Sequence, residues 1–141
     1  MAGLEQEIGH PDIVAFSKRI AEARSLAELE AAVQEAIGPS GLMEFARFDI
    51  GAVLQKEQGV KARKSLRLVA GNPLIMKEMA KHVPDAASYA PVTILIDERA
   101  DGVHLSYDRM VSFLAPYGNA EALQVARDLD SKIEALLAKV S

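Results

Sequence analysis

Apolar residues recur at helical spacing in two long stretches of the chain. The first predicts a helix over residues 25–37, with Ser25 and Glu28 as a capping box at its start and a Gly-Pro pair after its end. The second predicts a longer helix over 119–140, with Asn119 as its N-cap. The apolar stripe of this longer helix consists of Leu123, Ala126, Leu129, Ile133, Leu136, Leu137 and Val140.

Alternation of apolar and polar residues predicts a sheet in the middle of the chain. Strict alternation places Met43 and Phe45 on one face of its first strand and Phe48 on the other. The last two strands form an antiparallel hairpin around residues 98–102, where a glycine supplies the positive φ of the turn. The four strands are expected at residues 42–50, 65–70, 91–97 and 103–107.

The two faces of this hairpin differ in polarity. One face is half-polar, since Thr93, Leu95, His104 and Ser106 fall on it, and it could line a pocket, form a dimer interface or meet water. The other face is apolar and is expected to be the core side, covered by helices. Its residues are Val92, Ile94, Ile96, Val103, Leu105 and Tyr107.

The remaining segments are less regular. Residues 1–11 are expected to form a flexible leader. Residues 12–21 are expected to form a first strand, although their amphipathic pattern also suits a helix. Short helices are expected over 51–59 and over 108–114, the latter with Asp108 as its N-cap.

Together these elements predict an α+β fold. We expect a single two-layer domain over residues 12–141, in which an antiparallel-rich sheet has its helices packed mainly on one face. The helix over 25–37 and the last helix are both expected on that face.

The composition is that of a globular protein, since 50% of the 141 residues are hydrophobic and 26% are charged. A net charge of −4 argues against a nucleic-acid partner, which requires a basic surface. No membrane-spanning run, secretory signal or cysteine is present, so we expect a cytoplasmic protein of bacterial type. One basic run is interpreted as a solvated loop rather than an anion site: Lys56, Lys61, Arg63, Lys64 and Arg67.

A Gly-Asn-Pro corner joins the strand at 65–70 to a helix expected to end near Lys81. Asn72 is a favoured N-cap, Pro73 suits the first helical position, and Gly71 permits a sharp turn. Local structure therefore explains the corner. A helix N-terminus also presents free N–H groups to an anion, so a ligand role stays open.

The corner and the segments after it resemble the domain-of-unknown-function family numbered 302, most closely over residues 65–110. The resemblance implies a compact two-layer domain that tends to form homodimers, in a family with no settled activity. Two positions depart from the family pattern: Ile50 stands where relatives often carry His, and Ala90 where they usually carry Leu. The residues that carry the resemblance are Gly71, Asn72, Pro73, Met76, Pro91, Asp101, Gly102, Ser106, Tyr107 and Asp108.

The first functional hypothesis is a non-enzymatic homodimer that binds a small ligand between the corner and the Tyr107 end of the hairpin. A protein-partner module is an alternative. An enzyme is a weaker alternative, because the family's His is missing; its candidate acid–base residues are Asp49, His104 and Asp108. The candidate ligand-binding residues are Gly71, Asn72, Pro73, Met76, His104, Ser106 and Tyr107.

A haem- or metal-binding protein is the main alternative. Met76, Met79 and His82 are spaced by three residues, and thioethers with an imidazole can bind Cu(I) or haem iron, as can His104. However, steps of about 100° place Met76 and His82 roughly 120° apart, so only adjacent members share a helix face. Core packing of the methionines and a helix-dipole contact of His82 are the simpler interpretation.

Overall fold

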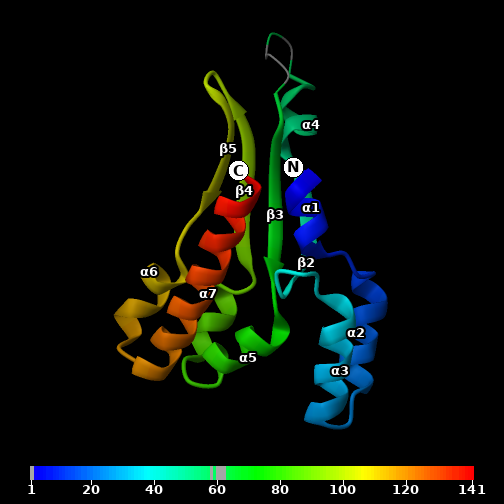
Figure 1. Cartoon of the computed structure of the whole chain (residues 1–141), viewed down its shortest axis with the longest axis vertical. Helices are drawn as coiled ribbons and strands as arrows, with labels where there is room; N and C mark the ends of the chain where they lie inside the picture. The colour runs from blue at the N-terminus through cyan, green and yellow to red at the C-terminus, as the bar shows by residue number, and fades with distance from the viewer. Residues whose placement is uncertain (1, 58, 60–62) are drawn as a thin grey trace.

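Five strands form one sheet in the order β1-β2-β3-β4-β5 (Figure 1). The computed structural model describes residues 2–57, 59 and 63–141. Among the strand pairs of the described residues, only β1–β2 is parallel, so the α+β prediction of an antiparallel-rich sheet is confirmed. The strands are β1 (Ile8–Gly9), β2 (Leu42–Asp49), β3 (Ser65–Gly71), β4 (Val92–Arg99) and β5 (Gly102–Tyr107).

The main core lies between the sheet and helix α7 (Ala120–Val140), which runs along one face of the strands (Figure 1). The predicted cap is confirmed, because Asn119 Oδ1 accepts a hydrogen bond from the Ala122 N–H at 2.9 Å. Cross-strand register places Leu68 of β3 opposite Ile94 of β4, and both side chains are buried against the helix. The residues of β3 and β4 on this face are Leu66, Leu68, Ala70, Val92, Ile94 and Ile96.

The chain's first residues belong to the core, so the prediction of a flexible leader over 1–11 is wrong. They form helix α1 (Ala2–Glu7) and then strand β1, which pairs with β2. Leu4 is 1% exposed and Ile8 is 2% exposed, both within the cluster under α7. So short a strand is stabilised by contacts distant in sequence, and therefore its local pattern does not reveal it.

Two helices connect β1 to β2 and form a hairpin: α2 (Ile13–Glu22) and α3 (Leu26–Ala36). The strand prediction for 12–21 is therefore wrong and its helical alternative is right, with Asp12 as the N-cap. The hairpin packs on Met43, whose side chain points to the opposite side of the sheet from Leu42 and the α7 core. Contrary to expectation, the helix at 25–37 thus does not share a face with α7.

A β-bulge in β2 changes which side chains share a face. The register with β3 shifts between Glu44 and Ala46, so that Phe48 lies opposite Arg67. Strict alternation therefore fails here, and Phe48 lies on the face that Met43 occupies, away from α7. This places an aromatic side chain on the face that α7 leaves uncovered.

Shorter elements close the two ends of the sheet. The helix expected over 51–59 ends earlier, at Leu54, and residues 58 and 60–62 lie outside the described part. At the other end, the predicted helix after the Gly-Asn-Pro corner is confirmed. Among the described residues, no helix is long and apolar enough to cross a membrane. The shorter elements are α4 (Ile50–Leu54), α5 (Pro73–Ala80), η1 (Pro84–Ser88), α6 (Met110–Leu114) and η2 (Ala115–Tyr117).

Candidate functional site

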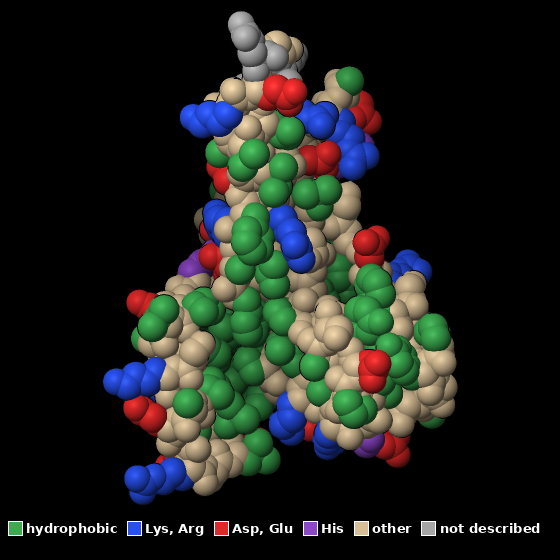
Figure 2. Space-filling view, turned by 180° about the vertical axis from the view of Figure 1, so that it is seen from behind, with side chains coloured by type: hydrophobic (Ala, Val, Ile, Leu, Met, Phe, Trp, Pro, Cys, Tyr) green, Lys and Arg blue, Asp and Glu red, His purple; other side chains and the backbone are tan. Residues whose placement is uncertain are grey.

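A cavity of about 470 Å³ lies on the face of the sheet that α7 leaves uncovered. Its floor consists of four side chains from three adjacent strands, Arg67, Thr93, Leu95 and Ser106. Pairing of Arg67 with Leu95, and of Leu95 with Ser106, sets three of them in one row across the sheet. Figure 2 shows this side of the molecule as a largely apolar hollow between two lobes.

The half-polar face of the hairpin, for which three roles were open, thus contributes to a cavity. Thr93, Leu95 and Ser106 line it, whereas His104 does not. The opposite face is the core side as expected over most of its length. Its exception is Val103, which is 58% exposed near the hairpin turn.

Stacked aromatic rings form one wall of the cavity. Tyr89, which follows η1, and Phe113 of α6 have ring centroids 4.9 Å apart and planes inclined by 15°. The Tyr89 and Tyr117 hydroxyls are 3.2 Å apart, and the Tyr117 hydroxyl donates to Asp85 at 3.3 Å. The hydrogen bond with Tyr89, with burial and the charge of Asp85, raises the pKa of Tyr117 to about 12. The hydroxyl of Tyr117 therefore ties η2 to η1 and to Tyr89.

Arg67 is the cation of the cavity floor and is held on two sides. Its Nε–H donates to Thr93 Oγ1 at 3.2 Å, and its guanidinium carbon lies 5.6 Å from the ring centroid of Phe48. Because β3 begins at Ser65, Arg67 belongs to a central strand and not to the solvated loop in which it was expected. The hydrogen bond to Thr93 engages Nε and leaves the two terminal nitrogens of the side chain out of it.

A buried carboxylate fixes the other end of the cavity. Asp130 of α7 is 5% exposed and accepts hydrogen bonds from the Met110 N–H at 2.8 Å and the Val111 N–H at 3.0 Å. It also accepts one from the Tyr107 hydroxyl at 2.5 Å. Burial, together with this bond and the negative charge, raises the pKa of Tyr107 above its ordinary value.

The N-terminus of α6 is therefore stabilised from a distance. Asp108 was expected to cap this helix, but its N-cap is Arg109, without a side-chain cap bond, and Asp130 takes the role. Asp130 lies between Ala126 and Ile133 on the apolar stripe of α7. An acidic residue inside an apolar stripe is the signal that could have revealed it.

The Gly-Asn-Pro corner is occupied by its own structural contacts. Asn72 Oδ1 accepts from the Leu74 N–H, and Nδ2 donates to the Gly41 carbonyl, both at 2.9 Å. A side chain at Gly71 would approach Pro91 Cβ at 3.2 Å, which explains the glycine. Neither residue lines the cavity. The corner adjoins the cavity at Pro91, which lies close to Gly71 and lines the cavity.

A family model described as "Domain of unknown function DUF302" matches residues 16–140. The chain belongs to the DUF302 family. The resemblance in the sequence is thereby confirmed, and none of the curated proteins matches the chain.

A solved DUF302 protein has the same fold. It is the crystal structure of an uncharacterized conserved protein from Bacillus stearothermophilus, with a TM-score of 0.63 and 12% sequence identity. The match covers 93% of this chain and 92% of that one. At this identity the likeness concerns the fold alone.

In this DUF302 chain, the residues considered as metal or haem ligands are not gathered at one site. Met79 is fully buried in the core, Met76 packs against it, and His82 Nδ1 lies 2.9 Å from Glu121 Oε2. His104 Nε2 lies 2.6 Å from Asp101 Oδ1, at the other end of the sheet. Among the described residues, no group of three His, Asp or Glu side chains could hold a metal ion.

The acid–base candidates are likewise separate. Asp49 Oδ1 accepts from the Ala52 N–H at 2.9 Å and so caps α4. Asp108 lines the cavity, whereas His104 lines a different groove beside the C-terminal end of α7. The structure therefore does not bring these three groups into one cleft.

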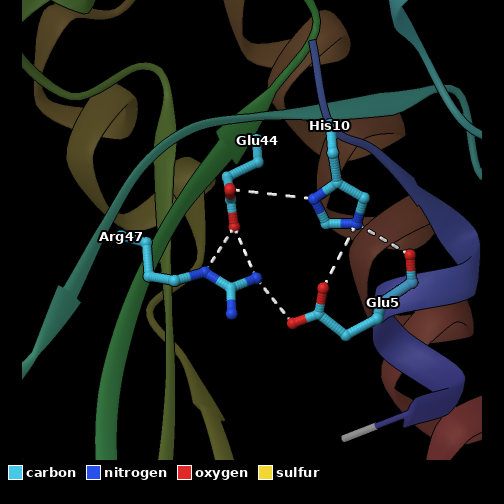
Figure 3. Close-up of polar contacts among 4 residues, drawn as sticks. All are labelled: Glu5, His10, Glu44 and Arg47. Carbon is cyan, nitrogen blue, oxygen red and sulfur yellow. Dashed lines mark hydrogen bonds and ion pairs between the residues drawn. The ribbon is translucent and has the colours of Figure 1, made fainter. Parts of the chain in front are cut away.

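A second polar cluster connects the N-terminal segment to β2 (Figure 3). His10 Nε2 lies 2.8 Å from the Glu5 carbonyl oxygen, and its Nδ1 lies 3.7 Å from Glu44 Oε2. Arg47 bridges the two carboxylates, at 2.5 Å from Glu5 Oε1 and 2.9 Å from Glu44 Oε1. Arg47 thus balances the carboxylates and anchors α1. The local pattern gives no sign of this cluster, because its two halves, Glu5 with His10 and Glu44 with Arg47, lie far apart in the chain.

Proposed function

We propose that this DUF302 protein binds a small, largely apolar molecule in the cavity on the uncovered face of its sheet. The observation that carries the proposal is a cavity of about 470 Å³ on a strand floor with a stacked aromatic wall. Ligand pockets have volumes of about 300–1,000 Å³ and combine mostly apolar walls with a few polar groups. Leu95, Tyr89 and Phe113 supply the apolar contacts, and the Thr93 and Ser106 hydroxyls supply polar ones.

We propose a binding role rather than a catalytic one. A catalytic site brings titratable groups together within reach of the reacting atoms. Asp49, His104 and Asp108 lie in three different surroundings instead. The Tyr107 hydroxyl is engaged with Asp130 in supporting α6. The polar groups on the cavity floor are suited to orienting a bound molecule.

We also propose that the protein forms a homodimer through β5. In the described part of the chain, β5 pairs only with β4, so its outer edge is available for strand addition. A groove of about 620 Å³ lies beside this edge and is lined in part by Leu105, Leu137 and Val140. A second copy would cover these apolar side chains. Sedimentation equilibrium tests the proposal, and a monomer at all concentrations contradicts it.

Titration with 2-naphthamide, a neutral aromatic probe, tests the binding proposal. In ¹⁵N–¹H correlation spectra we expect shifts confined to the strands and helices that line the cavity. Leu95→Trp fills the floor of the cavity and should abolish these shifts. Val14→Trp, at a site that is 82% exposed on α2, is the control and should leave them unchanged. Shifts that survive in the Leu95→Trp variant contradict the proposed site.

A further inference from the structure

Arg67 is arranged as a receptor for an anion. Its Nε is engaged by Thr93 and its guanidinium lies over Phe48, so the plane of the group is fixed by a hydrogen bond and by an aromatic face. What remains is the edge formed by the two terminal nitrogens. That edge matches the two oxygens of a carboxylate, which accept a pair of parallel hydrogen bonds.

No carboxylate of the protein satisfies that edge within the part of the chain that the structure describes. Four other arginines show the contrast, because each of these four forms an ion pair with an acidic side chain. Arg67 instead presents its charge to a cavity with an otherwise largely apolar lining. The paired arginines are Arg19, Arg47, Arg99 and Arg109.

The charges of the lining also give a bound molecule a direction. Arg67 is on β3, whereas the carboxylate of the lining, Asp108, follows the end of β5. In the row across the sheet, Leu95 separates Arg67 from Ser106. An anionic group is therefore favoured at the β3 side, and an apolar body would lie over Leu95.

We propose that the ligand of this cavity is an apolar monocarboxylate whose carboxylate pairs with the terminal nitrogens of Arg67. Its apolar body lies over Leu95 and against the wall formed by Tyr89 and Phe113. Thr93 acts as a positioning residue, since it orients the guanidinium through Nε. This inference rests on the proposed function, because it specifies the chemistry of a ligand for the same cavity.

The test compares two probes of the same size, 2-naphthoate and its neutral amide 2-naphthamide. Both are titrated into the wild-type protein, and the dissociation constants are taken from the chemical-shift changes. We expect the carboxylate to bind about tenfold more tightly than the amide, as hydrogen bonds to a charged group allow. In Arg67→Met the ratio should fall to about one, with binding of the amide retained.

Two further variants separate a site from general charge effects. Arg127→Met removes an exposed arginine of α7, outside the cavity lining, and should preserve the preference for the carboxylate. Thr93→Val keeps the charge but frees the guanidinium, so it should reduce the preference about threefold. Because it retains Arg67, it also provides a test if Arg67→Met fails to fold.

The outcomes distinguish this inference from the proposed function. Equal binding of both probes to the wild-type protein overturns the anion inference and leaves the cavity as a binding site. Loss of the preference in Arg127→Met as well as in Arg67→Met also overturns it, because attraction to the overall charge would then suffice. Failure of both probes to bind the wild-type protein contradicts the proposed function itself.

Discussion

Replacing Asp130 by Asn should weaken the fold at the end of the sheet where the cavity lies. The carboxylate accepts three hydrogen bonds, from the Tyr107 hydroxyl and from the N–H groups of Met110 and Val111. Asn keeps the shape of the side chain but turns one acceptor into a donor.

The magnitude follows from these contacts. Hydrogen bonds to a charged group contribute about 1.5–3 kcal/mol each, and a buried donor left without a partner costs about 1–3 kcal/mol. The loss is smallest when the new amide group takes the Oδ2 position and faces the Val111 N–H, so that one bond is lost and one donor is left unpaired. The other two bonds persist in weaker, uncharged form. We expect the free energy of unfolding to fall by about 2–4 kcal/mol in Asp130→Asn.

Urea denaturation followed by circular dichroism at 222 nm measures this change. The midpoint should move down by roughly 1–2 M urea while the slope stays constant. Asp128→Asn is the matched control on the same helix, since Asp128 is exposed and should change stability by less than about 0.5 kcal/mol. Equal stabilities of the two variants would refute the role assigned to Asp130.

Leu4→Ala should lower the free energy of unfolding by about 2–4 kcal/mol, because the Leu4 side chain is buried. Urea denaturation measures this loss, with Val14→Ala at an exposed position as the control. The pKa of Tyr107 is raised in the folded state, so the contribution of this residue to stability is fully present below the ordinary tyrosine pKa of about 10. It declines as the pH rises above that value. Melting temperatures between pH 9 and 11 should therefore fall more steeply in wild type than in Tyr107→Phe; parallel curves contradict this. Val103→Lys on β5 should shift a sedimenting dimer to monomer, and an unchanged dimer excludes that interface.

Elements with strong local patterns were predictable. The strand at 65–70, the hairpin and the last helix follow from alternation, from a glycine turn and from an apolar stripe that starts at Asn119. The Gly-Asn-Pro corner was equally clear as a strand-to-helix turn. In each of these segments, the residues that determine the structure are neighbours in the sequence.

Features that depend on distant partners were not predictable. Strand β1 exists because it pairs with β2, and the bulge near Glu44 turns Phe48 to the uncovered face. Asp130 caps a helix that precedes it by about twenty positions. For the site, alternation placed Thr93, Leu95 and Ser106 on one face, but only the register with β3 adds Arg67 to them.

The most direct test of the cavity as a ligand site is a set of contacts between a bound probe and the methyl groups of its floor. Isotope-filtered nuclear Overhauser spectra of the wild-type protein, saturated with 2-naphthoate, report protons within about 5 Å of one another. The account predicts contacts from the naphthyl protons to the methyl groups of Leu95 and Thr93. Contacts confined to Val103 and Leu137, in the groove beside β5, would contradict it.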